Sequence, residues 1–174
     1  MRIRGWLVGA VAFVALLAQP SAQSKTSWRP TVVATHGMVA AGHPLAAEAG
    51  LRILKAGGNA VDAAVATWAV QGEVEPGMTG LGSDMFMLIY LAKTGEVKFI
   101  NGTGFAPQAA TIDFYKSKGG LPDEGPLSIA VPGAVGGAAF ALRKYGTRPL
   151  ADVLAPAIEI ADQGFPITGR SPAS

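Results

Sequence analysis

The pattern of apolar and polar positions is most regular between residues 75 and 107. Residues 85–91 are apolar at every position, and residues 96–100 form a second, mixed segment after a short polar stretch. An uninterrupted apolar run is typical of a strand that is covered on both faces. Because Lys93-Thr94-Gly95 has the composition of a tight turn, these residues predict a β-hairpin.

Glycine-rich bends flank the predicted hairpin at residues 80–84 and 101–104. Two such bends at one end of a hairpin can surround a small ligand with backbone N–H groups, and they can equally be tight turns. Asp84 has the same two readings, as a polar contact for a ligand amine or as a turn residue. Spacing alone leaves both readings open.

Four longer segments have the apolar spacing of α-helices. The first begins at Pro44, a residue suited to the first helical position, and ends at Gly57-Gly58. The second covers 61–70 and is apolar on nearly every side, which predicts a buried helix. The third covers residues 134–145 and the fourth covers residues 150–161, and a single helical turn is expected at 112–116. Pro156 lies inside the fourth segment and is expected to kink that helix or split it.

Polar residues at two of these helices have structural interpretations. Asn59 and Asp62 are the polar residues in the first turn of the second helix, at a spacing related to the capping box. We therefore expect them to cap the helix rather than to act in catalysis. Glu48 and Arg52 stand four positions apart in the first helix and are expected to pair on its outer face.

Three short segments, at residues 31–34, 38–41 and 128–131, have the composition of strands. Together with the hairpin they predict an α+β chain of about four or five strands. The helix over 61–70 and the strand over 85–91 both need cover on two sides, and the remaining elements are too few to supply it. The sequence therefore predicts that this chain is part of a larger unit.

Composition narrows the classes of function. The chain has 174 residues, of which 49% are hydrophobic and 15% charged, so it is long and apolar enough for one globular core. A net charge of +2 with scattered basic residues predicts no nucleic-acid binding. Cysteine is absent, and His36 and His43 lack the His-Glu-x-x-His spacing, so no metal site is predicted. No motif predicts a cofactor: residues 80–85 lack the third glycine of a dinucleotide fingerprint, and Ser83 is not in a Gly-x-Ser-x-Gly elbow.

The first residues resemble an export signal. Arg2 and Arg4 precede an apolar run over residues 6–18, which is shorter than the ~20 residues of a membrane span, and residues 22–24 offer a small-x-small cleavage site. We expect residues 1–24 to be a signal peptide and the protein to be periplasmic or secreted, with no membrane contact after cleavage. An uncleaved N-terminal anchor is the alternative.

Several stretches together resemble the γ-glutamyltransferase (glutathione hydrolase) family. Residues 53–66 read Ile-Leu-Lys-Ala-Gly-Gly-Asn-Ala-Val-Asp-Ala-Ala-Val-Ala, and 79–90 read Thr-Gly-Leu-Gly-Ser-Asp-Met-Phe-Met-Leu-Ile-Tyr. The order and spacing of the matching stretches carry the resemblance over nearly all of residues 31–168. The other matching stretches are residues 37–50, 74–76, 106–107, 131–133, 145–147, 154–158 and 164–165.

The resemblance implies an N-terminal-nucleophile hydrolase, in which two stacked sheets lie between helix layers in an αββα sandwich. In such enzymes a precursor cuts itself, and the new N-terminal threonine of the small subunit attacks the amide. Residues 25–174 are similar only to the N-terminal portion of the large subunit, so no catalytic residue is expected here. The implied partners are a glutathione-like amide substrate, the rest of the large subunit and the small subunit.

One departure from the family concerns substrate binding. Family members selective for γ-glutamyl groups carry Asp-x-Arg-Glu-x-Ala-Pro where residues 101–107 read Asn-Gly-Thr-Gly-Phe-Ala-Pro, and their arginine holds the α-carboxylate. Thr103 stands at the arginine position, where it can form only one neutral hydrogen bond in place of a charged pair about twice as strong. Asn101 and Thr103 are therefore candidate substrate-binding residues. Phe105 is either an apolar wall of the pocket or a core residue.

The sequence leaves three hypotheses about function. The chain is the start of a γ-glutamyl amide hydrolase or transferase, the start of an acylase with a different acyl group, or an inactive truncated product.

Overall fold

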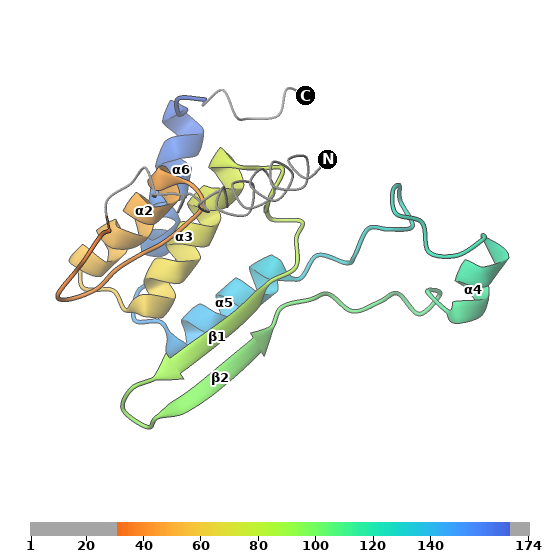
Figure 1. Cartoon of the computed structure of the whole chain (residues 1–174), viewed down its shortest axis with the longest axis horizontal. Helices are drawn as coiled ribbons and strands as arrows, with labels where there is room; N and C mark the ends of the chain where they lie inside the picture. Colours follow the sequence, from red (N-terminus) through yellow and green to blue (C-terminus); the bar gives the residue numbers. More distant parts are fainter. Residues whose placement is uncertain (1–30, 168–174) are drawn as a thin grey trace, which may run out of the picture. The chain divides into compact units, whose positions relative to one another are not determined.

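The computed structural model describes residues 31–167. The chain divides into two compact units, residues 1–34 and 35–174. The predicted signal peptide (1–24) lies outside the described residues. The elements of the second unit are α2 (Pro44–Lys55), α3 (Ala60–Val74), β1 (Phe86–Leu91), β2 (Glu96–Asn101), α4 (Ile112–Ser117), α5 (Ala134–Tyr145) and α6 (Leu150–Gln163) (Figure 1).

The predicted hairpin is confirmed. Strands β1 and β2 pair antiparallel from Phe86 opposite Asn101 to Leu91 opposite Glu96. Gly95 takes a φ of 70° in the turn, and its N–H donates to the carbonyl oxygen of Leu91 at 2.8 Å. Glycine adopts this left-handed conformation without the steric cost that a side chain would bring.

The four longer helices and the short helix α4 are also confirmed. Helix α6 continues through Pro156 as one helix, so the predicted split is wrong. Pro156 lacks the N–H of a normal helix residue. However, its side chain is buried, and Val153 and Ala157 on the same helix are buried in the core. We infer that this packing keeps the two halves of the helix together.

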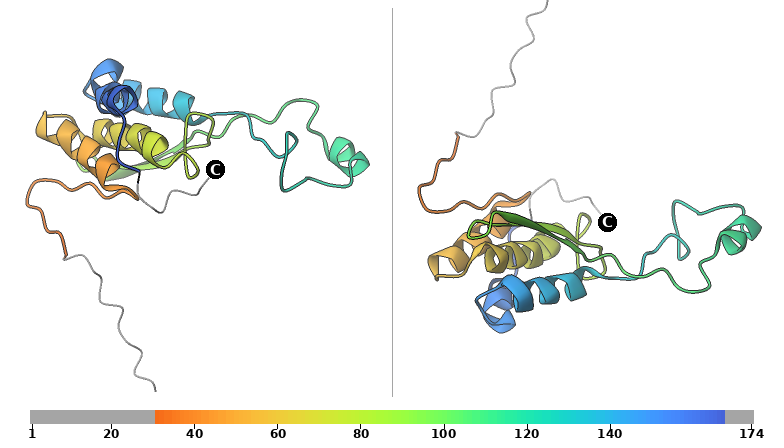
Figure 2. Two further views of the ribbon diagram at one scale, coloured as in Figure 1. Left: turned by 90° about the horizontal axis from the view of Figure 1, so that it is seen from above. Right: turned by 90° about the horizontal axis from the view of Figure 1, so that it is seen from below.

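Helix α3 lies at the centre of the packing. Helices α2, α5 and α6 all contact it, and its apolar side chains are buried on most sides, as predicted. Ile89 and Ile100 lie on the inner face of the hairpin. They belong to the same buried cluster as Val65 of α3 and Ala138 of α5. In the right-hand view of Figure 2, α3, α5 and α6 lie on one side of the hairpin.

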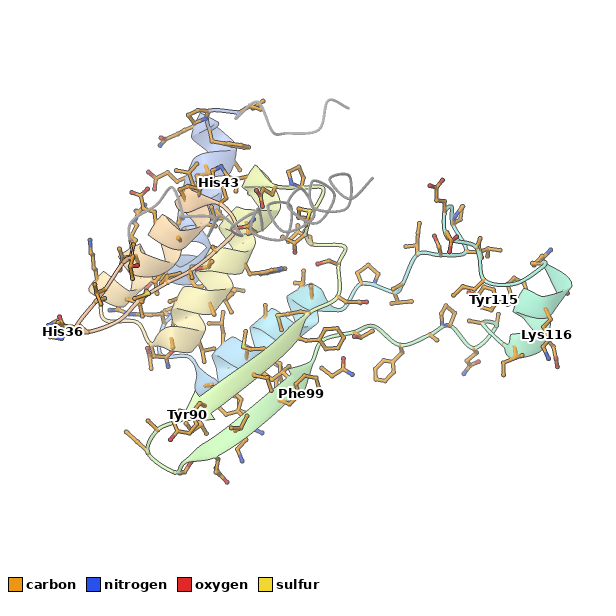
Figure 3. The ribbon with its side chains drawn as sticks, viewed as in Figure 1. His36, His43, Tyr90, Phe99, Tyr115 and Lys116 are labelled. Atoms are coloured by element: carbon orange, nitrogen blue, oxygen red, sulfur yellow. The ribbon has the colours of Figure 1, made fainter. Side chains whose placement is uncertain are left out.

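The opposite face of the hairpin is apolar and exposed. We call it the outer face; it consists of Phe86, Leu88, Tyr90, Val97 and Phe99, which are between 60% and 73% exposed. Tyr90 and Phe99 are marked in Figure 3. The expectation of a strand covered on both faces is therefore met on one face only within the described residues.

The three short predicted strands are wrong. Residues 31–34, 38–41 and 128–131 contain no strand, and the sheet in the described part of the chain has two strands rather than four or five. A strand is defined by its pairing, and these segments have no pairing partner among residues 31–167. Arg52 also differs from expectation, because it pairs with Glu159 of α6 at 2.6 Å rather than with Glu48.

No helix among the described residues is both long and apolar enough to cross a membrane.

Candidate functional site

Three glycine-containing segments meet at the end of the hairpin where β1 begins and β2 ends. They are residues 80–84, 101–104 and 131–133. The N–H of Gly102 donates at 2.7 Å to the carbonyl oxygen of Met85, the residue that follows the first segment, and this bond ties the first segment to the second. The carbonyl oxygen of Ser83 accepts from Ala134 N–H at 2.9 Å, which ties the first segment to the start of α5. Elements distant in sequence therefore converge on one loop cluster.

Close backbone contact explains the glycines of the second and third segments. A Cβ atom on Gly104 would overlap the carbonyl oxygen of Val131, and one on Gly133 would overlap the carbonyl oxygen of Gly102. Gly80 and Gly82 of the first segment have no such neighbours. Of the two readings that spacing left open, tight backbone packing thus applies to residues 101–104 and 131–133.

Asn101 and Thr103 are brought together in this cluster. The backbone N–H of Thr103 donates to Asn101 Oδ1 at 2.9 Å, so the Asn101 side chain closes a local turn. Both residues are exposed. The Thr103 hydroxyl and the Asn101 amide nitrogen are thus available at the surface for a substrate.

Phe105 is 93% exposed, so its reading as a core residue is wrong for this chain. Its reading as a pocket wall stays a prediction. Phe105 follows Thr103 by two residues, so it can contact the same ligand. Its own side chain is left uncovered by the other described residues.

The segment that carries Thr103 is uncharged. Residues 101–107 contain no ionisable side chain, and the exposed Asp84 adjoins Met85, the residue paired with Gly102. A carboxylate near the turn disfavours a second carboxylate on a bound ligand. Residues 101–107 therefore offer no charged partner for an anionic group.

Asp62 acts as a structural carboxylate, as predicted. It is fully buried and forms a capping box with Asn59, whose backbone N–H donates to Asp62 Oδ2 at 2.8 Å. It also accepts from Thr147 Oγ1 at 2.7 Å and from the N–H of Arg148 at 3.2 Å. Burial, the largest single influence, raises the pKa of Asp62, but the hydrogen bonds from Thr147, Asn59 and Arg148 together lower it below its usual value of 3.8.

The two histidines lie apart and have different surroundings (Figure 3). His36 is exposed, whereas His43 caps α2, because its Nδ1 accepts from the N–H of Leu45 at 3.2 Å. Within residues 31–167, no three His, Asp or Glu side chains form a group that could hold a metal ion.

Sequence reasoning missed two grooves on the helical layer. One, of about 460 Å³, lies between residues 38–42 and helices α2 and α3. The other, of about 260 Å³, lies between α3, α5 and α6. Trp68 lines both, and its buried Nε1 has no hydrogen-bond partner among the described residues. Grooves between elements depend on long-range packing, which no local pattern encodes.

A family model described as gamma-glutamyltranspeptidase matches residues 46–173. The chain belongs to the gamma-glutamyltranspeptidase family. The resemblance inferred from the quoted stretches is thereby confirmed at the level of the family.

Individual relatives of this gamma-glutamyltranspeptidase-family chain carry different names. The "glutathione hydrolase-like YwrD proenzyme" of Bacillus subtilis is 46% identical over 139 residues, which cover 79% of this chain and 26% of the relative. The crystal structure of a cephalosporin acylase from Bacillus halodurans matches with a TM-score of 0.76 and 44% identity, over 87% of this chain and 28% of the other. Helicobacter pylori gamma-glutamyltranspeptidase matches with a TM-score of 0.75 and 36% identity, over 82% and 42%.

These matches establish an α+β fragment that corresponds to part of the N-terminal-nucleophile hydrolase fold, as expected. The chain spans about a quarter of the length of the curated relatives that it matches.

Proposed function

We propose that this chain is the N-terminal portion of the large subunit of an amidohydrolase precursor, and that residues 1–24 direct the precursor to the periplasm or the exterior. The family match over residues 46–173, combined with coverage of about a quarter of the relatives, supports the assignment to the N-terminal portion of the precursor. The proposed export rests on the basic start and the apolar run of residues 2–18 alone. The nucleophile and the groups that stabilise the oxyanion then belong to the remainder of the precursor. The present residues supply the helical layer, a hairpin and one edge of the substrate pocket.

The exposed outer face of the hairpin supports the proposal. Large apolar patches on a soluble protein usually mark an interaction surface, and a two-stranded sheet is marginally stable on its own. Leu88 and Phe99 lie opposite each other on this face, and both are at least 60% exposed. The remainder of the large subunit and the small subunit are the partners that we propose for it.

Two classes of amide substrate remain for the assembled enzyme. The neutral surface around Thr103 and the nearby Asp84 favour an acyl group without an α-carboxylate, and a cephalosporin acylase is among the similar structures at 44% identity. A γ-glutamyl amide such as glutathione is the second candidate, favoured by the similarity to a glutathione hydrolase-like proenzyme. Asn101 and Thr103 are the residues that we propose to contact either substrate.

Thr103→Arg in the full precursor tests this assignment. The arginine restores a charged bidentate contact of about 1.5–3 kcal/mol, which corresponds to a gain of about 10- to 100-fold in kcat/KM for a γ-glutamyl anilide. Hydrolysis of a neutral acyl anilide should not gain. Thr103→Lys, which adds charge without the planar fork, is the matched control and should gain less.

Two results would count against the proposal. A Thr103→Arg precursor that gains no γ-glutamyl activity would contradict the position of the pocket. Turnover of any amide by the 174 residues alone would contradict the absence of a catalytic group from this chain.

A further inference from the structure

Asn101 and Gly102 form the one Asn-Gly pair of the sequence, at the point where β2 ends in the loop cluster. An asparagine followed by glycine readily loses its side-chain amide, because glycine has no Cβ to hinder the attack of its backbone nitrogen. Asn101 is exposed. The other asparagine, Asn59, precedes an alanine and caps α3. The chain therefore has one asparagine in a reactive sequence context and one in an unreactive context.

The reaction begins at the backbone nitrogen of Gly102. This nitrogen gives up its proton and attacks Cγ of Asn101, and the side-chain nitrogen leaves with that proton as ammonia, so that a cyclic imide forms. Water then adds to one of the two imide carbonyls, the bond from that carbon to the Gly102 nitrogen breaks, and the nitrogen regains a proton. Opening at Cγ leaves an aspartate. Opening at the main-chain carbonyl leaves an isoaspartate, whose main chain is one atom longer.

Three contacts in the folded chain oppose the first step. The Gly102 N–H donates to the carbonyl oxygen of Met85 at 2.7 Å, so it is directed away from the side chain that it must attack. Asn101 Oδ1 accepts from the Thr103 N–H at 2.9 Å, which fixes that side chain. Asn101 is also paired with Phe86 in the sheet, and the imide ring requires its backbone to leave the extended conformation. The end of the hairpin must therefore open before the imide can form.

Packing against α5 restrains this opening. Gly102 is buried, and a Cβ placed on it would lie 3.4 Å from the Cα of Gly137. A Cβ placed on Gly133, just before α5, would lie 2.1 Å from the carbonyl oxygen of Gly102. The start of α5 thus fits closely over the reactive pair and holds it in an unreactive conformation.

We propose that Asn101 is a site of spontaneous deamidation, and that opening of the end of the hairpin sets its rate. Both products place a carboxylate beside Thr103, within residues 101–107, which otherwise carry no charge. Isoaspartate also lengthens the main chain immediately before Gly102 and so displaces Thr103. The chemistry follows from the geometry of the hairpin end, and only its effect on a substrate rests on the proposed function.

Peptide mapping of the full precursor by mass spectrometry, after incubation at mildly alkaline pH, tests the site. The two hydrogen bonds to Met85 and from Thr103 must break, so Asn101 should react about 5- to 150-fold more slowly in the folded precursor than in urea. Asn59 is the internal control and should react far more slowly than Asn101 in urea. Equal rates for Asn101 in the two states would overturn the role of the fold. An Asn101 that stays intact in urea, or reacts no faster than Asn59 there, would overturn the site.

Gly133→Ala tests the restraint from α5. Its methyl group would displace the Gly102 carbonyl, so deamidation of Asn101 in the folded precursor should accelerate by about 2- to 10-fold, the effect of one weakened hydrogen bond. Gly136→Ala, the same substitution where no atom lies within 4 Å, is the matched control and should leave the rate unchanged. An unchanged rate in Gly133→Ala would contradict the restraint. If that variant does not fold, its Asn101 must react at the rate measured in urea, and a slower reaction would also overturn the proposal.

Activity separates this inference from the proposed function. Asn101→Asp reproduces one product, and it should lower kcat/KM for a γ-glutamyl anilide about 2- to 10-fold more than for a neutral acyl anilide, because the new carboxylate opposes the α-carboxylate. Equal effects on the two substrates would contradict the consequence for binding. A precursor that deamidates as described but hydrolyses no amide would support the site and reject the proposed function. A precursor that hydrolyses amides but keeps Asn101 intact in urea would do the reverse.

Discussion

Replacement of Asp62 by asparagine tests the joint between the start of α3 and the turn that links α5 to α6. The carboxylate accepts from the N–H of Asn59, from both the N–H and the hydroxyl of Thr147, and from the N–H of Arg148, at 2.7–3.2 Å. Asparagine keeps the size of the side chain but replaces one acceptor oxygen with a donor that faces other donors. Hydrogen bonds to a buried charged group contribute about 1.5–3 kcal/mol each. We therefore expect Asp62→Asn to lower the free energy of unfolding by about 3–5 kcal/mol.

The same carboxylate predicts a dependence on pH. Its pKa in the folded chain is lowered below 3.8, so the unfolded chain binds a proton more readily than the folded chain does. The stabilisation is therefore complete well above pH 3.8 and is lost as the pH falls through the lower, folded pKa. The Asp62→Asn protein has no such group and should lose less stability than the wild type between pH 5 and the acid limit.

Urea unfolding followed by far-ultraviolet circular dichroism, at neutral and at acid pH, measures both effects. Asp84→Asn is the matched control, because Asp84 is exposed, and it should change the unfolding free energy by less than about 0.5 kcal/mol. An Asp62→Asn protein as stable as the wild type at neutral pH would refute the reasoning. So would an acid-induced loss of stability that is identical in the two proteins.

Four further experiments test the packing and the outer face. Gly50→Ala should destabilise the chain by about 1–3 kcal/mol in thermal unfolding, because its Cβ would overlap Thr67 Oγ1. Gly136→Ala, in α5 with no neighbour within 4 Å, should instead stabilise it by about 0.5–1 kcal/mol, and the opposite order would contradict the model of close helix packing. A double-mutant cycle on Arg52 and Glu159 should give less than about 1 kcal/mol, because both side chains are about half exposed. Leu88→Ser should reduce the binding of a hydrophobic dye by the 174-residue chain, and undiminished binding would show that the outer face is not the dye's site.

The helices, the hairpin and the caps were predictable because their signals are local. The helix α5 was predicted with the bounds that the structure gives, Ala134–Tyr145, from its apolar spacing and the following Gly146. The pairing of Asn59 with Asp62 followed from a spacing of three residues. Sequence did not reveal that Asp62 also binds Thr147, since that contact spans 85 positions along the chain.

Contacts between distant segments account for the errors. Arg52 was expected to pair with the residue one helical turn away, but Glu159 of α6 lies closer to it in the folded chain. The neighbouring glycines at the start of α5 have different surroundings. Gly137 does approach Gly102 and Met85, whereas Gly136 has open space around it. Periodicity identifies the faces of a helix but not which neighbour each face meets.

The mistaken strands and the exposed outer face have a common physical explanation. Strand-forming composition describes how well a segment fits a half-buried sheet, and it becomes a strand only when a neighbour supplies the hydrogen bonds. Residues 38–41 have that composition without a neighbour, and the outer face around Leu88 has apolar side chains without cover. Both observations concern groups without a partner among residues 31–167. The hairpin itself keeps its register because Ile89 and Ile100 pack against α3 and α5 on the inner face. One covered face thus suffices to fix the two strands, while the outer face stays exposed.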